Sequence, residues 1–247
     1  MLVRIPGVAI PLSRATWAAK SEAYACLICE HLSRSTIWLD AGCGCRLLEE
    51  DMDTLENWLV AQCRSVFGID PEVNSHRNIK SVLQGSLYHL PFRHNSFDLI
   101  TCRMVVEHLE EPHTAFTEVA RCLRPGGSFV AITPNLLNYG VFANAVATKV
   151  LPEKVRLRIV HATDSRADGD IFPVRYKANT KHRLAHLLNA SGLQVHKTVS
   201  LCQQQSYWKK HPSFEKVVMW MTPTNVLLIC AHKPRERAGS FGAAEAA

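Results

Sequence analysis

A strand-like run that ends in a glycine turn occupies residues 37–46, which read I-W-L-D-A-G-C-G-C-R. Three apolar residues followed by Asp40 predict a buried strand, and Gly42 and Gly44 predict a tight turn directly after it. Because glycine has no Cβ, such a turn allows a ligand to approach the backbone closely. The pattern favours an α/β fold in which a strand leads into a ligand-binding loop.

Apolar periodicity alternates between strand and helix along most of the chain. A strand, a helix and a strand in succession make a right-handed parallel crossover, and its repetition indicates a doubly wound sheet with helices on both faces. The segment Arg124-Pro125-Gly126-Gly127 is typical of a helix end followed by a turn. Strands are expected at 37–39, 65–69, 81–84, 97–102, 128–133, 193–201 and 225–232, and helices at 16–32, 47–62, 74–79, 112–123 and 180–190.

This alternation stops after Pro134, where residues 136–150, 153–161 and 207–221 have helical periodicity. We interpret residues 136–180 as a lid-like helical insertion after the fifth strand, which contributes to binding of a substrate. The predicted organisation is an N-terminal helical extension (1–35), one α/β domain (36–234) and a disordered tail (235–247).

The composition is that of a soluble globular protein, since 47% of the residues are apolar, 20% are charged and the formal net charge is +6. The nine cysteines are scattered through apolar segments, which favours free thiols in a reducing cytoplasm. Cys26 and Cys29 have no second pair at zinc-finger spacing, so no metal site is expected. No apolar run reaches the roughly 20 residues needed to cross a bilayer, and no secretion signal is recognisable.

Candidate ligand-binding residues stand where the predicted strands end. In open α/β sheets, ligands bind outside the carboxyl ends of the strands, and Asp40, Asp70, Ser86 and Cys102 occupy such ends. An ionised Asp70 can accept hydrogen bonds from both hydroxyls of a ribose. A nicotinamide-binding domain is the competing interpretation, but its glycine pattern requires a third glycine where Leu47 stands.

Together these motifs resemble class I S-adenosylmethionine-dependent methyltransferases of the methyltransferase type 11 group, which includes ubiquinone and menaquinone methyltransferases. The turn matches the family pattern D-x-G-x-G-x-G, except that Arg46 replaces the last glycine. The resemblance covers about residues 36 to 135 and implies a Rossmann-like, seven-stranded mixed sheet whose last strand is antiparallel. The other matching segments are Gln84-Gly85-Ser86, Leu90-Pro91-Phe92, Ser96-Phe97-Asp98-Leu99-Ile100, Val106-Glu107-His108-Leu109 with Pro112, and Leu123-Arg124-Pro125-Gly126-Gly127.

The resemblance places the cofactor, S-adenosyl-L-methionine, at the carboxyl edge of the sheet. It implies that the glycine turn holds the methionine and ribose, that the segment after the third strand lies against the adenine, and that the end of the fourth strand lies beside the methionine. The family often has an acid where Ser86 stands. The cofactor-binding residues implied in this way are Asp40, Ala41, Gly42, Cys43, Gly44, Asp70, Pro71, Gly85, Ser86, Leu87, Cys102 and Arg103.

His108 is the candidate catalytic residue, because a histidine titrates near neutral pH and can deprotonate an acceptor hydroxyl. The alternative is a structural histidine. A sulfonium methyl is already electrophilic, so in-line alignment of the acceptor can supply much of the acceleration. No obligatory catalytic triad is expected.

The acceptor class is indicated by the residues after the fourth strand. The sequence T-C-R-M stands where nucleic-acid amino-methyltransferases have an N-P-P-Y-like run, so nucleic acid is not expected as a partner. A small-molecule, lipid or carrier-linked acceptor, methylated on oxygen or carbon, is expected. Residues 141–159 suit either docking on a membrane or long-chain substrate, or a core helix with a solvated face. Arg46 and Ser86 motivate a second hypothesis, a catalytically degenerate binding or interaction module.

Overall fold

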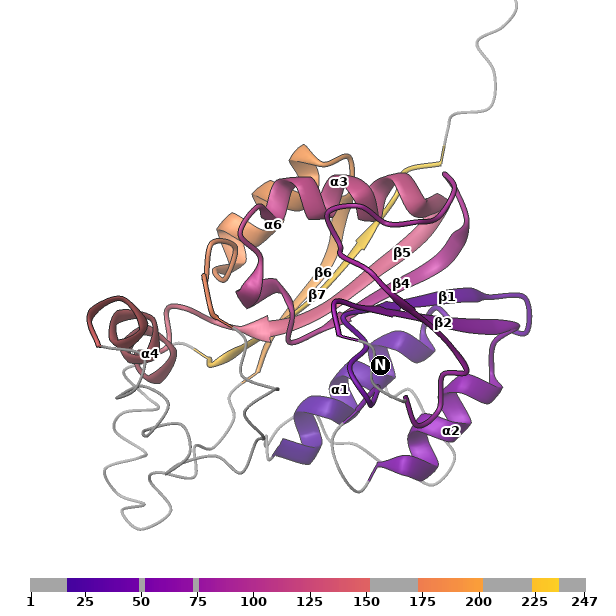
Figure 1. Ribbon diagram of the computed structural model, residues 1–247, viewed down its shortest axis with the longest axis horizontal. Coiled ribbons are helices and arrows are strands. Elements are labelled where there is room, and N and C mark those ends of the chain that lie inside the picture. The colour runs from indigo at the N-terminus through magenta and orange to yellow at the C-terminus, as the bar shows by residue number, and fades with distance from the viewer. Residues whose placement is uncertain (1–16, 49–51, 73–75, 152–172, 202–223, 236–247) are drawn as a thin grey trace, which may run out of the picture.

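Seven strands form one mixed sheet: β1 (Ile37–Ala41), β2 (Ser65–Asp70), β3 (Ser81–Gln84), β4 (Phe97–Arg103), β5 (Leu123–Pro134), β6 (Gln194–Leu201) and β7 (Val226–His232). Their spatial order is β3-β2-β1-β4-β5-β7-β6. Strands β1 to β5 pair in parallel, and β7 pairs antiparallel with both β5 and β6. The computed structural model, shown in Figure 1, describes residues 17–48, 52–72, 76–151, 173–201 and 224–235. The doubly wound, Rossmann-like mixed sheet with its antiparallel last strand is confirmed.

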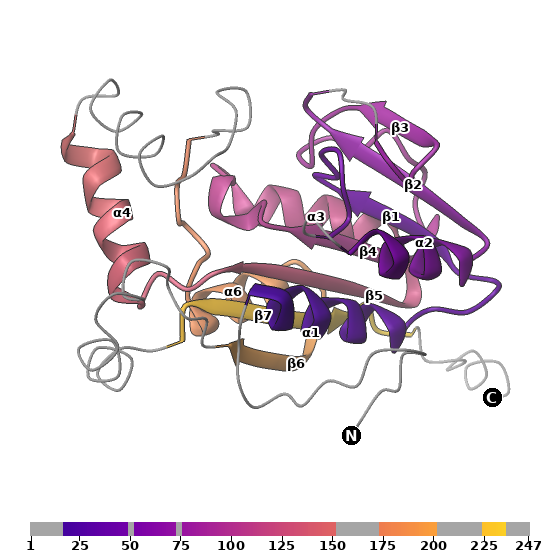
Figure 2. The same ribbon diagram turned by 90° about the horizontal axis from the view of Figure 1, so that it is seen from below.

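The described helices are α1 (Trp17–Cys29), α2 (Asp53–Ala61), the 3₁₀ turn η1 (Val106–His108), α3 (Pro112–Cys122), α4 (Tyr139–Val150) and α6 (Lys181–Ala190). Helices α1, α2, α3 and α6 cover the two faces of the sheet. Strand side chains alternate between two buried layers, so Trp38 belongs to one and Leu39 to the other. Helices α3 and α6 pack on the layer that contains Leu39, and α1 and α2 pack on the opposite layer (Figure 2). The carboxyl ends of β1 to β5 therefore meet at one edge of a sheet that is covered on both faces.

Two helices begin where local chemistry favours a helix start. Pro112 occupies the first turn of α3, where its missing N–H would have no partner in any case. Phe116 and Val119 then bury the inner side of that helix completely. Thr180 caps α6, because its hydroxyl accepts a hydrogen bond from the Arg183 N–H at 3.2 Å. The predicted helices in these two regions are confirmed.

Two of the predicted helices are wrong in their extent or their existence. The helix predicted at 47–62 begins only at Asp53. The Leu48 N–H donates to the Glu56 carboxylate at 2.6 Å, and this hydrogen bond keeps Leu48 in the loop before the helix. The helix predicted at 74–79 is absent from the described residues 76–79. There the His76 Nδ1 accepts the N–H groups of the second and third following residues, which makes a local turn.

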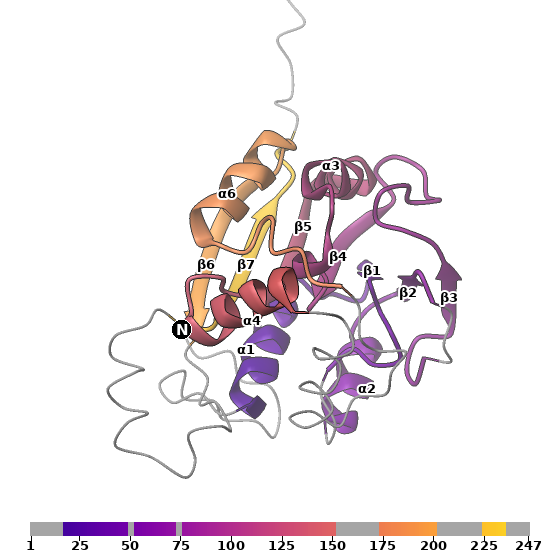
Figure 3. The same ribbon diagram turned by 60° about the vertical axis from the view of Figure 1, so that its left-hand side comes forward.

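The predicted turn at Arg124-Pro125-Gly126-Gly127 is an irregularity inside β5, where the pairing with β4 passes from Leu123 directly to Ser128. Helix α4 follows β5 and stands beyond the carboxyl edge of the sheet, apart from the layered core (Figure 3). It forms the described start of the predicted lid-like insertion. The predicted helical segments 153–161 and 207–221, and the tail from residue 236, lie outside the described residues.

Candidate active site

The glycine turn after β1 is hydrogen-bonded to the end of β2. The N–H groups of Gly42 and Cys43 both donate to the Ile69 carbonyl, at 2.7 and 3.2 Å. Gly42 has φ +75°, and a Cβ there would lie 2.2 Å from Val105 Cγ2. Gly44 has φ +51°, and a Cβ there would meet nothing within 4 Å. The first glycine is thus required by packing, whereas the second leaves an open space directly above the backbone.

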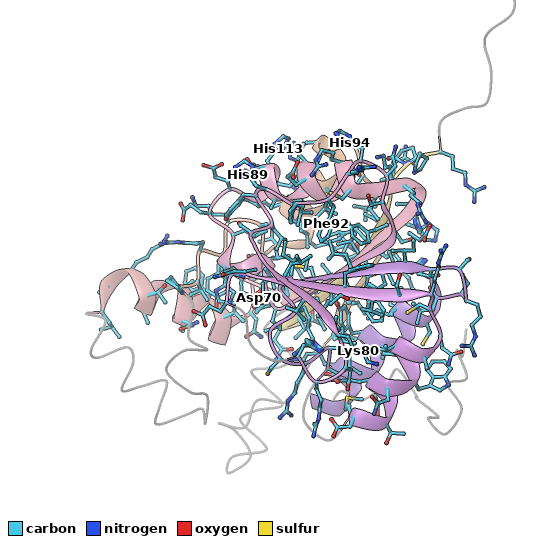
Figure 4. The ribbon with its side chains drawn as sticks, turned by 45° about the vertical axis from the view of Figure 1, so that its right-hand side comes forward. Asp70, Lys80, His89, Phe92, His94 and His113 are labelled. Atoms are coloured by element: carbon cyan, nitrogen blue, oxygen red, sulfur yellow. The ribbon has the colours of Figure 1, made fainter. Side chains whose placement is uncertain are left out.

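Asp70 joins the end of β2 to this turn. One of its carboxylate oxygens accepts the Gly44 N–H at 2.9 Å, and the other accepts the Glu72 N–H at 3.0 Å. The side chain lies at the carboxyl edge of the sheet, as Figure 4 shows. Each carboxylate oxygen has a further lone pair, so the group can accept ligand hydroxyls while it supports the turn.

Asp40 is buried inside the sheet, where its carboxylate accepts the Thr101 hydroxyl at 2.6 Å. The Trp38 indole N–H in turn donates to that hydroxyl oxygen at 2.7 Å. Burial raises the pKa of Asp40 to about 7. Burial and the nearby Asp40 carboxyl raise the pKa of Tyr24, on α1, well above its usual value. The N-terminal helix therefore forms the buried floor beneath the first strand's end.

A polar corner links the glycine loop to β4 and α2. The guanidinium of Arg103, at the end of β4, donates to the Arg46 carbonyl at 3.2 Å. Glu56 is completely buried and bonds both to Leu48 and to Asn78. Burial raises the pKa of Glu56, while the Leu48 N–H and the positive charges of Arg103 and Arg46 oppose that shift. Arg46 thus lies in a loop that is tied down on two sides.

The segment after β3 continues the same edge. The Gly85 N–H donates to the Asp70 carbonyl at 2.9 Å, and a Cβ at Gly85 would lie 2.7 Å from Ile69 Cδ1. The Ser86 hydroxyl accepts the Tyr88 N–H at 3.3 Å, and Leu87 is buried. These residues, together with Pro71 directly after β2, lie next to the glycine turn.

His108 lies on η1, just beyond the end of β4. Its Nδ1 is 3.0 Å from the Pro173 carbonyl oxygen. Because a carbonyl oxygen only accepts hydrogen bonds, this contact places a proton on Nδ1, and in the neutral ring the lone pair is then on Nε2. His108 therefore has the tautomer that a proton acceptor needs.

A buried polar cluster lies beside His108. The Glu107 carboxylate accepts the Thr133 hydroxyl at 2.9 Å, and the Asn179 amide donates to that hydroxyl oxygen at 2.7 Å. Burial raises the pKa of Glu107. Within this cluster the buried oxygen Asn179 Oδ1 has no hydrogen-bond partner in the part of the chain that is described. The carboxyl ends of β4 and β5 therefore hold a buried carboxyl group, that of Glu107, next to an amide oxygen, that of Asn179, which can accept a further hydrogen bond.

The structure brings every residue named from the sequence to one edge of the sheet, but not all of their side chains face outward. The side chains of Asp40, Cys43 and Cys102 are buried. Sequence reasoning did not identify four buried polar residues at this edge, although two of them, Thr101 and Thr133, stand within apolar strand runs, which is the available signal. They are Glu56, Thr101, Thr133 and Asn179.

The geometry fits a nucleoside-containing ligand with an amino-acid moiety. The open space over Gly44 accepts a ligand against bare backbone, and Asp70 offers a carboxylate at the same place. The Arg103 guanidinium lies across the glycine loop and supplies positive charge for a carboxylate. A bare backbone, a carboxylate and a positive charge are the groups that a ribose and an amino-acid carboxylate require.

Comparison with protein families gives the same assignment. Residues 39–131 match the family model Methyltransf_11, which is described as a methyltransferase domain. The chain is 30% identical over 105 residues to an uncharacterized methyltransferase of Schizosaccharomyces pombe, covering 41% of this chain and 38% of that protein. It is 31% identical over 104 residues to the mitochondrial ubiquinone biosynthesis O-methyltransferase of the same yeast, covering 38% of this chain and 36% of that protein. The chain thus spans less than half the length of these curated relatives.

A solved structure shares the fold over most of the chain. The YcgJ protein of Bacillus subtilis superposes with a TM-score of 0.56 and 18% sequence identity, covering 87% of this chain and 99% of that one. At this identity the similarity establishes the fold. The predicted resemblance is therefore confirmed by both the matched domain and the architecture.

Proposed function

We propose that this chain transfers a methyl group from S-adenosylmethionine to a small-molecule, lipid or carrier-linked acceptor, since residues 39–131 match the methyltransferase domain of the family model Methyltransf_11. The observation that carries the proposal is the bond from the Gly44 N–H to Asp70 beneath an open space over the turn. It supplies a backbone cradle and a ribose acceptor at one place.

In this proposal the cofactor supplies an electrophilic methyl group, and the protein binds and aligns it. The glycine turn holds the methionine and ribose, Asp70 accepts the ribose hydroxyls, and Arg103 pairs with the carboxylate. The segment from Gly85 to Leu87 lies against the adenine. Alignment of the acceptor with the methyl group contributes most of the acceleration, about 7 to 11 kcal/mol in favourable cases.

His108 is the proposed proton acceptor when the methylated atom is a hydroxyl oxygen. Its Nδ1 proton is committed to Pro173, so Nε2 is the nitrogen that takes the hydroxyl proton as the oxygen attacks. The oxygen is the favoured target, since one relative is named as a ubiquinone biosynthesis O-methyltransferase. Methylation on carbon remains the second possibility for the same cofactor geometry.

An apolar acceptor is favoured by α4 at the rim of this edge. Phe142, Val146 and Val150 are 58%, 43% and 72% exposed and recur every four residues, so they share one face of the helix. Lys149 is the charged residue within α4. Such a face suits a lipid-like acceptor or peripheral contact with the membrane that contains it. None of the described helices is long and apolar enough to cross a bilayer.

We also propose a cytoplasmic location, because cysteines scattered through apolar segments suit a reducing compartment. The eight cysteines within the described residues are free thiols.

The test is formation of S-adenosylhomocysteine by the purified full chain with S-adenosylmethionine and a panel of acceptors. The panel contains catechols and hydroquinones with short and long alkyl chains, and single-stranded oligonucleotides as the nucleic-acid arm. Product with the phenolic acceptors, and none with oligonucleotides, is expected. Product with oligonucleotides alone would contradict the acceptor class, and Gly44→Val, whose side chain fills the open space over the turn, distinguishes enzymatic from contaminating activity.

A catalytically degenerate module is the second candidate, favoured by Arg46 in place of the third motif glycine and by Ser86, where the family often has an acid. It predicts binding of S-adenosylmethionine without turnover of any acceptor. A nicotinamide enzyme predicts binding of NAD instead. Titration of both ligands into the same protein separates the three functions.

A further inference from the structure

A short segment, residues 173–177, is joined by hydrogen bonds and ion pairs to residues 107–110, which follow β4. The N–H groups of Arg175 and Tyr176 both donate to the Glu107 carbonyl, at 2.7 and 3.0 Å. The Pro173 carbonyl accepts from His108 Nδ1 in the same stretch. Glu110 pairs with Arg175 at 2.7 Å, and it also pairs with Lys177. The segment therefore fixes both the backbone and the ring at His108.

Tyr176 gives this segment its shape. Its backbone has φ +52°, in the left-handed region that side chains other than glycine rarely adopt. Two successive N–H groups can converge on one oxygen when the backbone turns into this region, as those of Arg175 and Tyr176 do on Glu107. Such strained residues persist only where the surrounding structure holds them, and they cluster at functional sites.

The Tyr176 side chain extends the connection to α4. Its hydroxyl accepts the Asn144 amide N–H at 2.9 Å, and Asn144 lies on the helix that carries the exposed apolar face. One residue thus joins the proposed acceptor-facing helix to the carbonyl of Glu107. The side chain and the backbone of Tyr176 have separable roles.

We propose that Tyr176 is a positioning residue for His108, an inference that rests on the proposed function. Its left-handed backbone seats residues 173–177 so that the Pro173 carbonyl receives the Nδ1 proton of His108 and Nε2 is held as the proton acceptor. Its hydroxyl keeps α4 in register with that site. A change in the backbone at residue 176 therefore displaces the Pro173 carbonyl and alters which ring nitrogen of His108 carries the proton.

The experiment measures the tautomer directly, by long-range ¹H–¹⁵N correlation of histidine ring nitrogens in the full chain. The His108 signals are assigned by their loss in His108→Asn. Tyr176→Val forces a β-branched residue into the left-handed region, Tyr176→Gly tolerates that region, and Tyr176→Phe removes only the hydroxyl. Asn95→Val is the matched control, since Asn95 has φ +56° at the amino end of β4.

The expected result is an Nδ1-protonated His108 in the wild type, in Tyr176→Gly and in Tyr176→Phe, and a mixture of tautomers in Tyr176→Val. With an active acceptor, kcat of Tyr176→Val is expected to fall by about 10²-fold, while its affinity for S-adenosylmethionine is unchanged. Asn95→Val is expected to keep the wild-type tautomer. A wild-type His108 spectrum in folded Tyr176→Val would overturn the inference, as would an Nε2-protonated ring in the wild type. Failure of every acceptor alongside the expected tautomer change would reject the proposed function and leave the positioning of His108 intact.

Discussion

The Asp70 carboxylate accepts a hydrogen bond from the Gly44 N–H at 2.9 Å, although the two residues are 26 positions apart. The bond ties the end of β2 to the turn after β1 across the paired strands. Since Gly44 is also the place where the backbone is open to a ligand, the shape of the cradle and the position of the ribose acceptor depend on each other. Changes at either residue are expected to affect cofactor binding more than folding.

Replacement of Asp70 by Ala removes both the proposed ribose acceptor and the support of the turn. We expect affinity for S-adenosylmethionine to fall by about 1 to 3 kcal/mol, measured by isothermal titration. Glu72→Ala is the matched control, because Glu72 is exposed and only its backbone N–H contacts Asp70. Equal affinity of Asp70→Ala and wild type would remove Asp70 from the binding site.

The two glycines of the turn are expected to respond differently to alanine. At Gly42 the new Cβ meets Val105 at 2.2 Å, so strain and overlap should destabilise the fold by about 1 to 3 kcal/mol or more. At Gly44 the space is open, and only backbone strain of about 1 kcal/mol is expected. Thermal unfolding should therefore rank Gly42→Ala below Gly44→Ala. The reverse order would show that the turn packs differently.

Replacement of His108 by Asn tests its role as proton acceptor. We expect kcat for a hydroxyl acceptor to fall by about 10²- to 10⁴-fold, with unchanged affinity for S-adenosylmethionine because the ring is not in the proposed cofactor site. The measurement pairs steady-state kinetics with titration of the cofactor. A kcat within about twofold of wild type would assign His108 a structural role and favour methylation on carbon.

A histidine cluster at the amino end of β5 predicts acid sensitivity. His31 Nδ1 and His232 Nδ1 lie 3.1 and 2.9 Å from Ser128 Oγ, and Cys230 Sγ lies 3.3 Å from His31 Nε2. Burial lowers the pKa of His31 to about 4, and it also lowers the pKa of His232. The His196 ring packs against His232 in a tilted arrangement, with ring centroids 5.1 Å apart and an interplanar angle of 53°.

Because protonation of His31 is easier in the unfolded chain, its contribution to stability is complete above about pH 6.5 and is lost as the pH falls toward about 4. The nearby Glu30 opposes this shift and Lys197 reinforces it, and these two side chains pair with each other. Urea unfolding at pH 7 and pH 5 should show the loss, and His31→Gln should reduce it. An unchanged pH dependence in His31→Gln would contradict the assignment.

The apolar face of α4 predicts attachment to membranes that contain a lipid-like acceptor. We expect Phe142→Ser with Val146→Ser to lower partition into anionic vesicles by about tenfold or more, since each buried side chain contributes about 1.5 to 3 kcal/mol. Leu83→Ser is the control, because Leu83 is 42% exposed, as Val146 is 43%, but lies on β3. Absence of vesicle binding by the wild type would reject membrane contact and leave a soluble acceptor.

The sequence is sufficient to predict the sheet, because strand ends such as Asp40 and Asp70 coincide with the end of an apolar run. It is less informative between β1 and α2. There the helical periodicity begins at Leu47, but Glu56 on α2, eight residues further along, accepts the Leu48 N–H, and the helix begins only at Asp53. This contact forms only when the loop folds back onto α2, and it leaves no periodic pattern.

The candidate site is predictable as a set of positions, but not as a set of side-chain directions. Alternation along β1 buries the Asp40 side chain against Thr101, although its position in the motif suggests a ligand contact. Likewise, the tautomer of His108 is decided by Pro173, 65 residues away. No spacing rule connects those two residues before the chain folds.

Binding of the cofactor to the purified full chain tests the central claim most directly. Isothermal titration with S-adenosylmethionine, S-adenosylhomocysteine and NAD should show saturable one-site binding of the first two and none of NAD. The same titration of Gly44→Val, in which a side chain fills the open space, should show no binding by a folded protein. Absence of S-adenosylmethionine binding by the folded wild type, or equal binding by Gly44→Val, would contradict the account.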